Sequence, residues 1–179
     1  MLSLVIGGAR SGKSRFAQSL AARGARVVYL ATARAEDAEM AERIRRHRQD
    51  RPAHWITVEE PIGIGAAGER CAGSCDMLLL DCLTLWLSNF CWENRALSEA
   101  ALESAAQAEV ARLAASAAAL HIVIVTNEVG CGLVPETPLG RRFRDLQGFL
   151  NQQVACSADW VYHMVAGIAV TIKQPKVQG

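Results

Sequence analysis

The sequence predicts an α/β fold in which a mostly parallel β-sheet is covered by helices on both faces. Short apolar runs of strand length alternate with segments of helix length along the chain. The runs are apolar throughout, as is typical of parallel strands that are buried on both faces. Because the chain has 179 residues and no evident linker or repeat, it is expected to form one domain over residues 1–179.

The expected strands are runs rich in leucine, valine and isoleucine. They lie at residues 2–6, 27–31, 77–80, 122–125, 160–165 and 168–172. The first run ends at a Gly-Gly pair, which indicates a turn. The last two runs flank Ala166-Gly167 and predict a C-terminal β-hairpin.

The expected helices lie at residues 11–23, 36–50, 98–120 and 138–155, with a short amphipathic stretch at 83–90. The segment 98–120 is rich in alanine, the strongest helix former, and is expected to be the longest helix. Ser98 suits its N-terminus. The glycine-rich stretch at about 63–76 is expected to be a loop.

Composition excludes several classes of protein. The formal net charge is +1, whereas nucleic-acid-binding proteins usually carry a basic excess. No apolar run approaches the roughly 18–20 residues that span a bilayer, and the N-terminal apolar stretch is too short for a secretory signal. The six cysteines lack zinc-site spacing and are expected to stay free, with buried thiols at Cys82, Cys91 and Cys156. We therefore expect a cytoplasmic protein with no membrane span and no nucleic-acid partner.

Residues 7–14 match the phosphate-loop pattern G-x-x-x-x-G-K-[ST] at every specified position. They are Gly7, Gly8, Ala9, Arg10, Ser11, Gly12, Lys13 and Ser14. The motif follows an expected strand and opens an expected helix, which is the context that gives it meaning. Its backbone N–H groups can surround an anion, Lys13 can reach the β and γ phosphates, and the Ser14 hydroxyl can bind Mg²⁺. The sequence thus predicts a P-loop domain that binds a nucleoside triphosphate.

Asp81 directly follows the apolar run at 77–80 and is expected at the edge of the sheet where ligands bind. One interpretation is that its carboxylate helps to hold Mg²⁺, directly or through water. The alternative is that it caps the following helix. The residues alone favour the metal but leave both open.

The segment 36–50 carries Arg43, His47 and Arg51 at i, i+4 and i+8, so one helix face can present all three. A solvated basic helix is the plain interpretation and is favoured by composition. A second interpretation is that the His47 imidazole attacks phosphorus while nearby arginines stabilise the transferring group. Reasoning from the residues ends here, with triphosphate chemistry and a histidine of unknown target.

Several separated motifs together resemble the bifunctional adenosylcobinamide kinase / adenosylcobinamide-phosphate guanylyltransferase family of cobalamin biosynthesis. The resemblance runs from Leu4 to about Lys173. Beyond the phosphate loop, its motifs are Ala31-Thr32-Ala33, Glu39-Met40-Ala41 with Arg43-Ile44 and His47, Arg51-Pro52, Leu80-Asp81-Cys82-Leu83-Thr84, Thr126-Asn127-Glu128-Val129-Gly130 with Gly132 and Val134-Pro135, Arg142-Phe143-Arg144-Asp145, and Leu150-Asn151-Gln152.

The resemblance implies two reactions. ATP or GTP first phosphorylates the aminopropanol hydroxyl of adenosylcobinamide. The resulting phosphate then receives GMP from GTP through a guanylylated histidine, which gives adenosylcobinamide-GDP and pyrophosphate. The matching histidine here is His47, and this reverses the preference for a solvated basic helix.

The resemblance also implies roles for further residues and an oligomeric state. Lys13 and His47 would be catalytic, and Ser14 and Asp81 would place Mg²⁺. Nucleotide contacts would come from Thr32, Ala33, Arg34, Arg48, Gln49, Asp50, Arg51 and Glu59, together with the phosphate loop and Asp81. Family members are expected to associate, with a trimer as the expected oligomer. The main alternative is a simple P-loop small-molecule kinase that forms no covalent intermediate; a GTP-dependent switch is disfavoured because no Asn-Lys-x-Asp motif is found.

Overall fold

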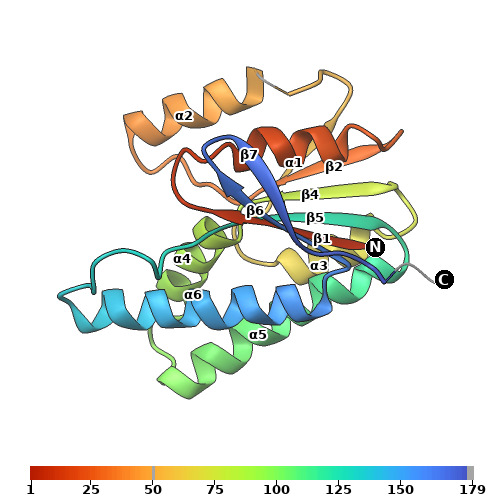
Figure 1. Ribbon diagram of the computed structural model, residues 1–179. Helices are drawn as coiled ribbons and strands as arrows, with labels where there is room; N and C mark the ends of the chain where they lie inside the picture. The colour runs from red at the N-terminus through yellow and green to blue at the C-terminus, as the bar shows by residue number, and fades with distance from the viewer. Residues whose placement is uncertain (50, 177–179) are drawn as a thin grey trace.

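The computed structural model describes residues 1–49 and 51–176, and over these residues seven strands form one sheet (Figure 1). Their bounds are β1 Leu2–Gly7, β2 Val27–Ala31, β3 Ile56–Glu59, β4 Met77–Asp81, β5 His121–Asn127, β6 Trp160–Val165 and β7 Ile168–Lys173. The order across the sheet is β3-β2-β4-β5-β1-β6-β7. Neighbours pair in parallel except for β7, which returns antiparallel to β6. The predicted mostly parallel sheet and its C-terminal hairpin are confirmed.

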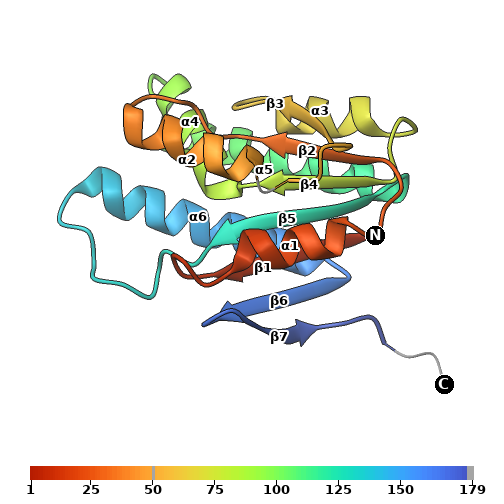
Figure 2. The ribbon, with the colours of Figure 1, turned by 90° about the horizontal axis from the view of Figure 1, so that it is seen from above.

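Helices cover both faces of this sheet. They are α1 Lys13–Ala21, α2 Ala38–Gln49, α3 Ile64–Cys71, α4 Leu83–Glu93, α5 Glu99–Ala115 and α6 Pro138–Ser157, with a 3-10 turn at Ser116–Ala118. Helices α1 and α2 lie on one side of the sheet and α3 to α6 on the other (Figures 1 and 2). Within the described residues, none of these helices combines the length and hydropathy that a bilayer-spanning segment needs.

Two apolar cores hold the layers together. The larger core lies between the sheet and α3 to α6 and includes the fully buried Trp86 and Leu113. The smaller core lies under α1 and includes Ala17, Tyr29 and Val125. By contrast, none of the residues of α2 is buried. Helix α2 therefore lies outside the two cores, and its polar side chains remain available for a site.

Several expectations about individual elements are wrong. The sequence reasoning missed strand β3 and read the glycine-rich stretch that contains α3 as a loop. The longest helix is α6 with 20 residues, not α5 with 17, because the alanine-rich segment changes to a 3-10 turn at Ser116. The thiol of Cys82 is buried as expected, but Cys91 is only half-buried and Cys156 is exposed. The expected N-cap is confirmed, since the Ser98 hydroxyl accepts a hydrogen bond from the Ala101 N–H.

Parallel pairing brings the carboxyl ends of the strands to one edge of the sheet. Gly7 pairs with Asn127, and Ala31 pairs with both Glu59 and Asp81. Motifs that lie far apart in the sequence therefore meet at this edge, which is where open α/β sheets bind ligands.

The opposite edge carries a histidine that makes stability depend on pH. Burial lowers the pKa of His121 below its usual value, and the N-terminal ammonium group acts in the same direction. Between the lowered pKa and about 6.5, the unfolded chain therefore binds more protons at this position than the folded protein, and stability falls as the pH falls. We expect His121→Gln to remove this loss. On acidification from pH 7, the free energy of unfolding should therefore fall more in the wild type than in the variant.

Urea unfolding at a series of pH values checks this expectation. A change at the exposed His54, His54→Gln, is the matched control and should run parallel to the wild type. Parallel curves for the wild type and His121→Gln would contradict the role given to His121.

Candidate active site

The segment between β1 and α1 folds as a phosphate loop. Strand β1 ends at Gly7, and α1 begins at Lys13, so the loop backbone lies at the N-terminus of a helix. Arg10 and Gly12 both have positive φ, 56° and 93° respectively. These left-handed residues curl the backbone, and a curled backbone directs several N–H groups toward one anion. The helix N-terminus adds partial positive charge at the same place.

The C-terminal hairpin supports this loop. The N–H of Gly167, in the turn between β6 and β7, donates to the carbonyl oxygen of Ser11 at 3.0 Å. A Cβ atom on Gly12 would lie 3.2 Å from the Gly167 Cα, and a Cβ on Gly7 would lie 2.5 Å from the Met164 carbonyl oxygen. The phosphate loop is thus packed so closely against the hairpin that a side chain at Gly7 does not fit, and one at Gly12 would press on Gly167.

This packing predicts different effects for two glycines of the same loop. Gly12→Ala places a side chain at a positive φ and against Gly167, so we expect it to lower the free energy of unfolding by about 1–3 kcal/mol. At Gly8 an added Cβ meets nothing within 4 Å. Gly8→Ala is therefore the control, and we expect it to leave stability nearly unchanged. Thermal unfolding of the nucleotide-free proteins measures both, and equal losses would contradict the packing argument.

Lys13 lies under the loop and is almost fully buried. Its ammonium group donates to the Gly8 carbonyl oxygen at 2.5 Å and to the Ser11 hydroxyl at 3.5 Å. Burial lowers the pKa of Lys13; the nearby Asp81 carboxylate opposes this effect, and the Arg43 guanidinium adds to it. Asp81 ends β4 and Arg43 belongs to α2, so both elements come within electrostatic range of the loop.

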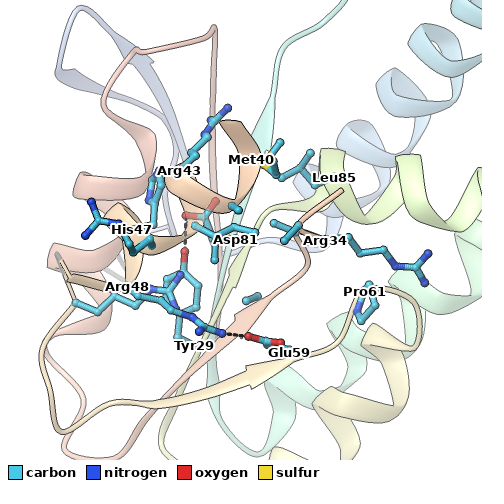
Figure 3. A pocket seen from close by; sticks show the side chains of 17 residues that line it. Tyr29, Arg34, Met40, Arg43, His47, Arg48, Glu59, Pro61, Asp81 and Leu85 are labelled. Carbon is cyan, nitrogen blue, oxygen red and sulfur yellow. Dashed lines mark hydrogen bonds and ion pairs between the residues drawn. The ribbon is translucent and has the colours of Figure 1, made fainter. Parts of the chain in front are cut away.

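Next to these groups is a cavity of about 570 Å³ between α2 and the ends of β2, β3 and β4 (Figure 3). Seven of the residues proposed from the sequence line it: Ala33, Arg34, His47, Arg48, Arg51, Glu59 and Asp81. Its remaining lining includes apolar side chains, among them Met40, Ile44, Pro61 and Leu85. The cavity therefore combines a histidine, cations and carboxylates with an apolar wall, a combination that is typical of small-molecule sites.

Asp81 lies on the floor of this cavity. Its Oδ2 accepts a hydrogen bond from the Tyr29 hydroxyl at 2.8 Å (Figure 3). The alternative that Asp81 caps the next helix is wrong, because the N-cap residue of α4 is Cys82 and no side chain caps that helix. Burial, followed by the negative charge of Asp81, raises the pKa of Tyr29 well above its usual value, so its hydroxyl stays protonated and able to donate. Burial likewise raises the pKa of the Cys82 thiol to about 12.

Helix α2 contributes two different faces. Arg45 and Arg46 form ion pairs with Glu42 of the same helix, at 2.7 and 2.8 Å, and both arginine side chains are largely exposed. The face that carries Arg43 and His47 lines the cavity. The plain interpretation of a solvated basic helix therefore describes Arg46, which is outside the cavity lining, but not the face of His47. Arg45 pairs with Glu42 and also lines the cavity.

Arg48 and Arg51 reach the cavity by different routes. Arg48 pairs with Glu59 at the end of β3 (Figure 3). Arg51 lies beyond the end of α2, not on the helix face expected from the i, i+4, i+8 spacing. Its guanidinium carbon lies 3.4 Å from the centre of the Tyr29 ring. Both cations are thus held by partners from neighbouring strands.

Two residues proposed as nucleotide contacts, Thr32 and Gln49, lie outside the cavity lining. The side chain of Thr32 is fully buried, and its hydroxyl donates to the Cys82 carbonyl oxygen and accepts from the Cys82 N–H. Thr32 therefore joins the ends of β2 and β4 and does not line the cavity. Gln49 is exposed and outside the lining. Asp50 lies outside the described residues.

Sequence reasoning missed Tyr29 and the apolar wall. Tyr29 belongs to an apolar strand, where an aromatic residue is usually part of the core. The wall residues Met40 and Ile44 did carry a signal, because their spacing places them on the same helix face as Arg43 and His47.

Comparison with known proteins identifies the family of this chain. Residues 3–172 match the model of the CobU family, described as cobinamide kinase / cobinamide phosphate guanyltransferase. The chain is 44% identical to the bifunctional adenosylcobalamin biosynthesis protein CobP of Pseudomonas aeruginosa, over 97% of this chain and 98% of that protein. It is 41% identical to the bifunctional adenosylcobalamin biosynthesis protein CobU of Escherichia coli, over 97% of this chain and all of that protein.

A solved structure shows the same fold at low identity. It is a prototypical ATPase from the type III secretion system of pathogenic bacteria, with a TM-score of 0.64 and 8% sequence identity. The match covers 95% of this chain and 56% of that chain. At 8% identity this likeness shows the fold alone, whereas the two relatives are 41% and 44% identical over 97% of this chain. The chain belongs to the cobinamide kinase / cobinamide phosphate guanyltransferase family.

Proposed function

We propose that this protein carries out two successive reactions on adenosylcobinamide. In the first, the aminopropanol hydroxyl attacks the γ-phosphorus of ATP or GTP, the bond to the β-phosphate breaks, and adenosylcobinamide phosphate and a nucleoside diphosphate form. In the second, an imidazole nitrogen of His47 attacks the α-phosphorus of GTP and pyrophosphate leaves. The phosphate of the acceptor then displaces the histidine and gives adenosylcobinamide-GDP.

The observation that carries this proposal is the place of His47 in a cavity beside the phosphate loop. His47 and Arg43 line the same cavity, and Arg43 is close enough to Lys13 to lower its pKa. A triphosphate held at the loop can therefore extend toward the face of α2 that carries the histidine. A covalent intermediate suits this arrangement, because the nucleotide can be handed over without both bulky substrates being bound at once.

The loop and the cavity would share the work of holding the nucleotide. Lys13 and the loop N–H groups would bind the phosphates, with Lys13 exchanging its contact with the Gly8 carbonyl for phosphate oxygens. Arg48 and Arg51 would stabilise negative charge during GMP transfer. The Nε of Arg51 is buried and has no acceptor among residues 1–49 and 51–176. A phosphate oxygen would supply that acceptor.

The residues at the edge of the sheet fit Mg²⁺. Ser14, in the first turn of α1, offers a hydroxyl, and Asp81 offers a carboxylate whose Oδ2 is already bound by Tyr29. Hydroxyl and carboxylate oxygens are the ligands that Mg²⁺ takes in phosphate sites. We propose that these two residues hold the ion, which supplies charge neutralisation on the phosphates when it is bound.

We further propose a cytoplasmic enzyme built from one domain, residues 1–179, that acts as a homo-oligomer such as a trimer. The resemblance described above supports the oligomer, and the length of the chain supports the single domain. Sedimentation equilibrium tests the oligomer, and a monomer at all concentrations would contradict it.

Incubation with adenosylcobinamide, GTP and Mg²⁺, followed by mass analysis of the corrinoid, tests the function. We expect adenosylcobinamide-GDP and an equal amount of pyrophosphate. A second reaction supplied with adenosylcobinamide phosphate tests GMP transfer on its own. A product that stops at adenosylcobinamide phosphate in the first reaction, with no conversion in the second, would favour a simple kinase. An unchanged corrinoid in both would contradict the proposal.

A further inference from the structure

Tyr29 contacts two side chains of the proposed site at once. It lies in the middle of β2 and is only 2% exposed, yet it lines the cavity. Its hydroxyl donates to Asp81 Oδ2, and its ring lies under the guanidinium group of Arg51. These partners come from β4 and from the chain beyond α2, so one buried side chain connects the floor of the cavity to its cationic wall.

The sheet geometry explains how Tyr29 reaches Asp81. In the parallel pair β2·β4, Tyr29 lies beside Leu79 and Ala31 lies beside Asp81. Tyr29 and Asp81 are therefore diagonal neighbours on one face of the sheet, a separation that an aromatic side chain can bridge. The hydroxyl binds one carboxylate oxygen and so fixes the plane of the carboxylate. The other oxygen, Oδ1, is left for a ligand.

The ring acts separately from the hydroxyl. A guanidinium group stacks well on an aromatic face, and stacking leaves its N–H groups free at the edge. Arg51 also donates from Nη1 to the Thr57 hydroxyl at 3.3 Å. Together these contacts hold the side chain of Arg51 over β2 rather than in solvent.

We infer that Tyr29 is a positioning residue of this site, whose hydroxyl orients Asp81 toward the metal-nucleotide and whose ring holds Arg51 against the nucleotide phosphates. This inference rests on the proposed function for the roles of Asp81 and Arg51. Tyr29 itself would touch neither the phosphates nor the acceptor, and it would act through its two partners, Asp81 and Arg51.

Tyr29→Phe removes only the hydroxyl and tests the contact with Asp81. The readout is GTP affinity, measured by calorimetry in EDTA and at increasing Mg²⁺ concentrations. We expect affinity in EDTA to be unchanged, while the Mg²⁺ concentration that gives half of the increase in affinity rises about tenfold, as is usual when a partner of a metal ligand is removed. In an Asp81→Asn background the same change should have no further effect, because the two residues act as a unit.

Tyr162→Phe is the matched control, since Tyr162 packs edge-on against Phe16 and lies outside the cavity lining. It should reproduce the wild type at every Mg²⁺ concentration. A wild-type Mg²⁺ response in Tyr29→Phe, or additive effects of Tyr29→Phe and Asp81→Asn, would overturn the assignment. This measurement needs neither corrinoid nor turnover, so it remains decisive even where the proposed reactions fail.

Tyr29→Leu removes the ring as well and tests the contact with Arg51. Thermal unfolding first establishes that the variant is folded at the assay temperature. Its incorporation of GMP from labelled GTP, at saturating Mg²⁺, should fall at least about tenfold below that of Tyr29→Phe. Arg51→Gln should produce the same loss and add little to Tyr29→Leu. Equal incorporation by folded Tyr29→Leu and Tyr29→Phe would overturn the role of the ring.

Discussion

Replacing His47 with asparagine is expected to reduce GMP transfer by roughly 10³-fold or more while leaving most of the phosphorylation of adenosylcobinamide. The expected loss is large because the substitution removes the proposed nucleophile, and losses of that kind are among the largest seen in enzymes. In the proposed reactions phosphorylation does not use the imidazole, and the phosphate loop lies outside α2. Rates are measured separately, with adenosylcobinamide for the first step and adenosylcobinamide phosphate for the second.

His54→Asn is the control for this experiment, because His54 is exposed and outside the cavity lining. It should retain both activities. Equal losses of both steps in His47→Asn would refute the division of labour between the histidine and the phosphate loop.

Lys13→Met is expected to lower both steps by about 10²- to 10³-fold. The substitution keeps an unbranched side chain of nearly the same length but removes the charge that would offset the phosphate oxygens. Since both of the proposed reactions hold the triphosphate at the loop, we expect kinase and transferase activities to fall together, in contrast to the result with His47→Asn. Single-turnover rates at saturating nucleotide measure the loss apart from binding.

Lys176→Met changes a lysine that is exposed near the end of the described chain, and it should behave as the wild type does. If Lys13→Met retained one step at its full rate, that step would take place away from the phosphate loop.

The parts of the fold that follow from local pattern could be predicted from the sequence. Strand β2 and the hairpin β6–β7 agree with the expected residues to within one position. Helix α3 was missed because its glycines were taken as loop signals. A Cβ on Gly65 would lie 2.8 Å from the Arg112 Cβ, and one on Gly68 would lie 2.8 Å from Leu113 Cδ1. These glycines let α3 pack closely on α5, a partner more than 40 residues away that local pattern cannot reveal.

Strand β3 was missed for a different reason. It has only four residues, and Ile56, Thr57 and Glu59 are exposed at the end of the sheet, so it lacks the apolar run expected of a buried strand. Its pairing with β2 is what brings Glu59 into the cavity. The resemblance had named Glu59, but nothing in the residues alone placed it near His47.

The site likewise has one part that local sequence pattern predicts and another that depends on residues far apart in the chain. The phosphate loop is a continuous motif and was predicted residue by residue, whereas the cavity forms from α2 and the ends of three strands. Thr32 is expected at the nucleotide from the resemblance; in the structure its hydroxyl finds both partners on Cys82 and joins the ends of β2 and β4. Tyr29 was overlooked because a buried phenol reveals its role only through its acceptor, which lies 52 residues away.

Peptide mapping after reaction with GTP tests the central claim most directly, namely that the imidazole of His47 reaches the α-phosphorus of a nucleotide held at the phosphate loop. The protein is incubated with Mg²⁺ and GTP labelled at the α-phosphate, kept at alkaline pH to preserve the nitrogen–phosphorus bond, digested and analysed by mass spectrometry. We predict GMP on the peptide that contains His47, no label with GTP labelled at the γ-phosphate, and release of the GMP by mild acid. GMP attached to another residue, or unmodified protein under conditions in which adenosylcobinamide-GDP is formed, would contradict the account.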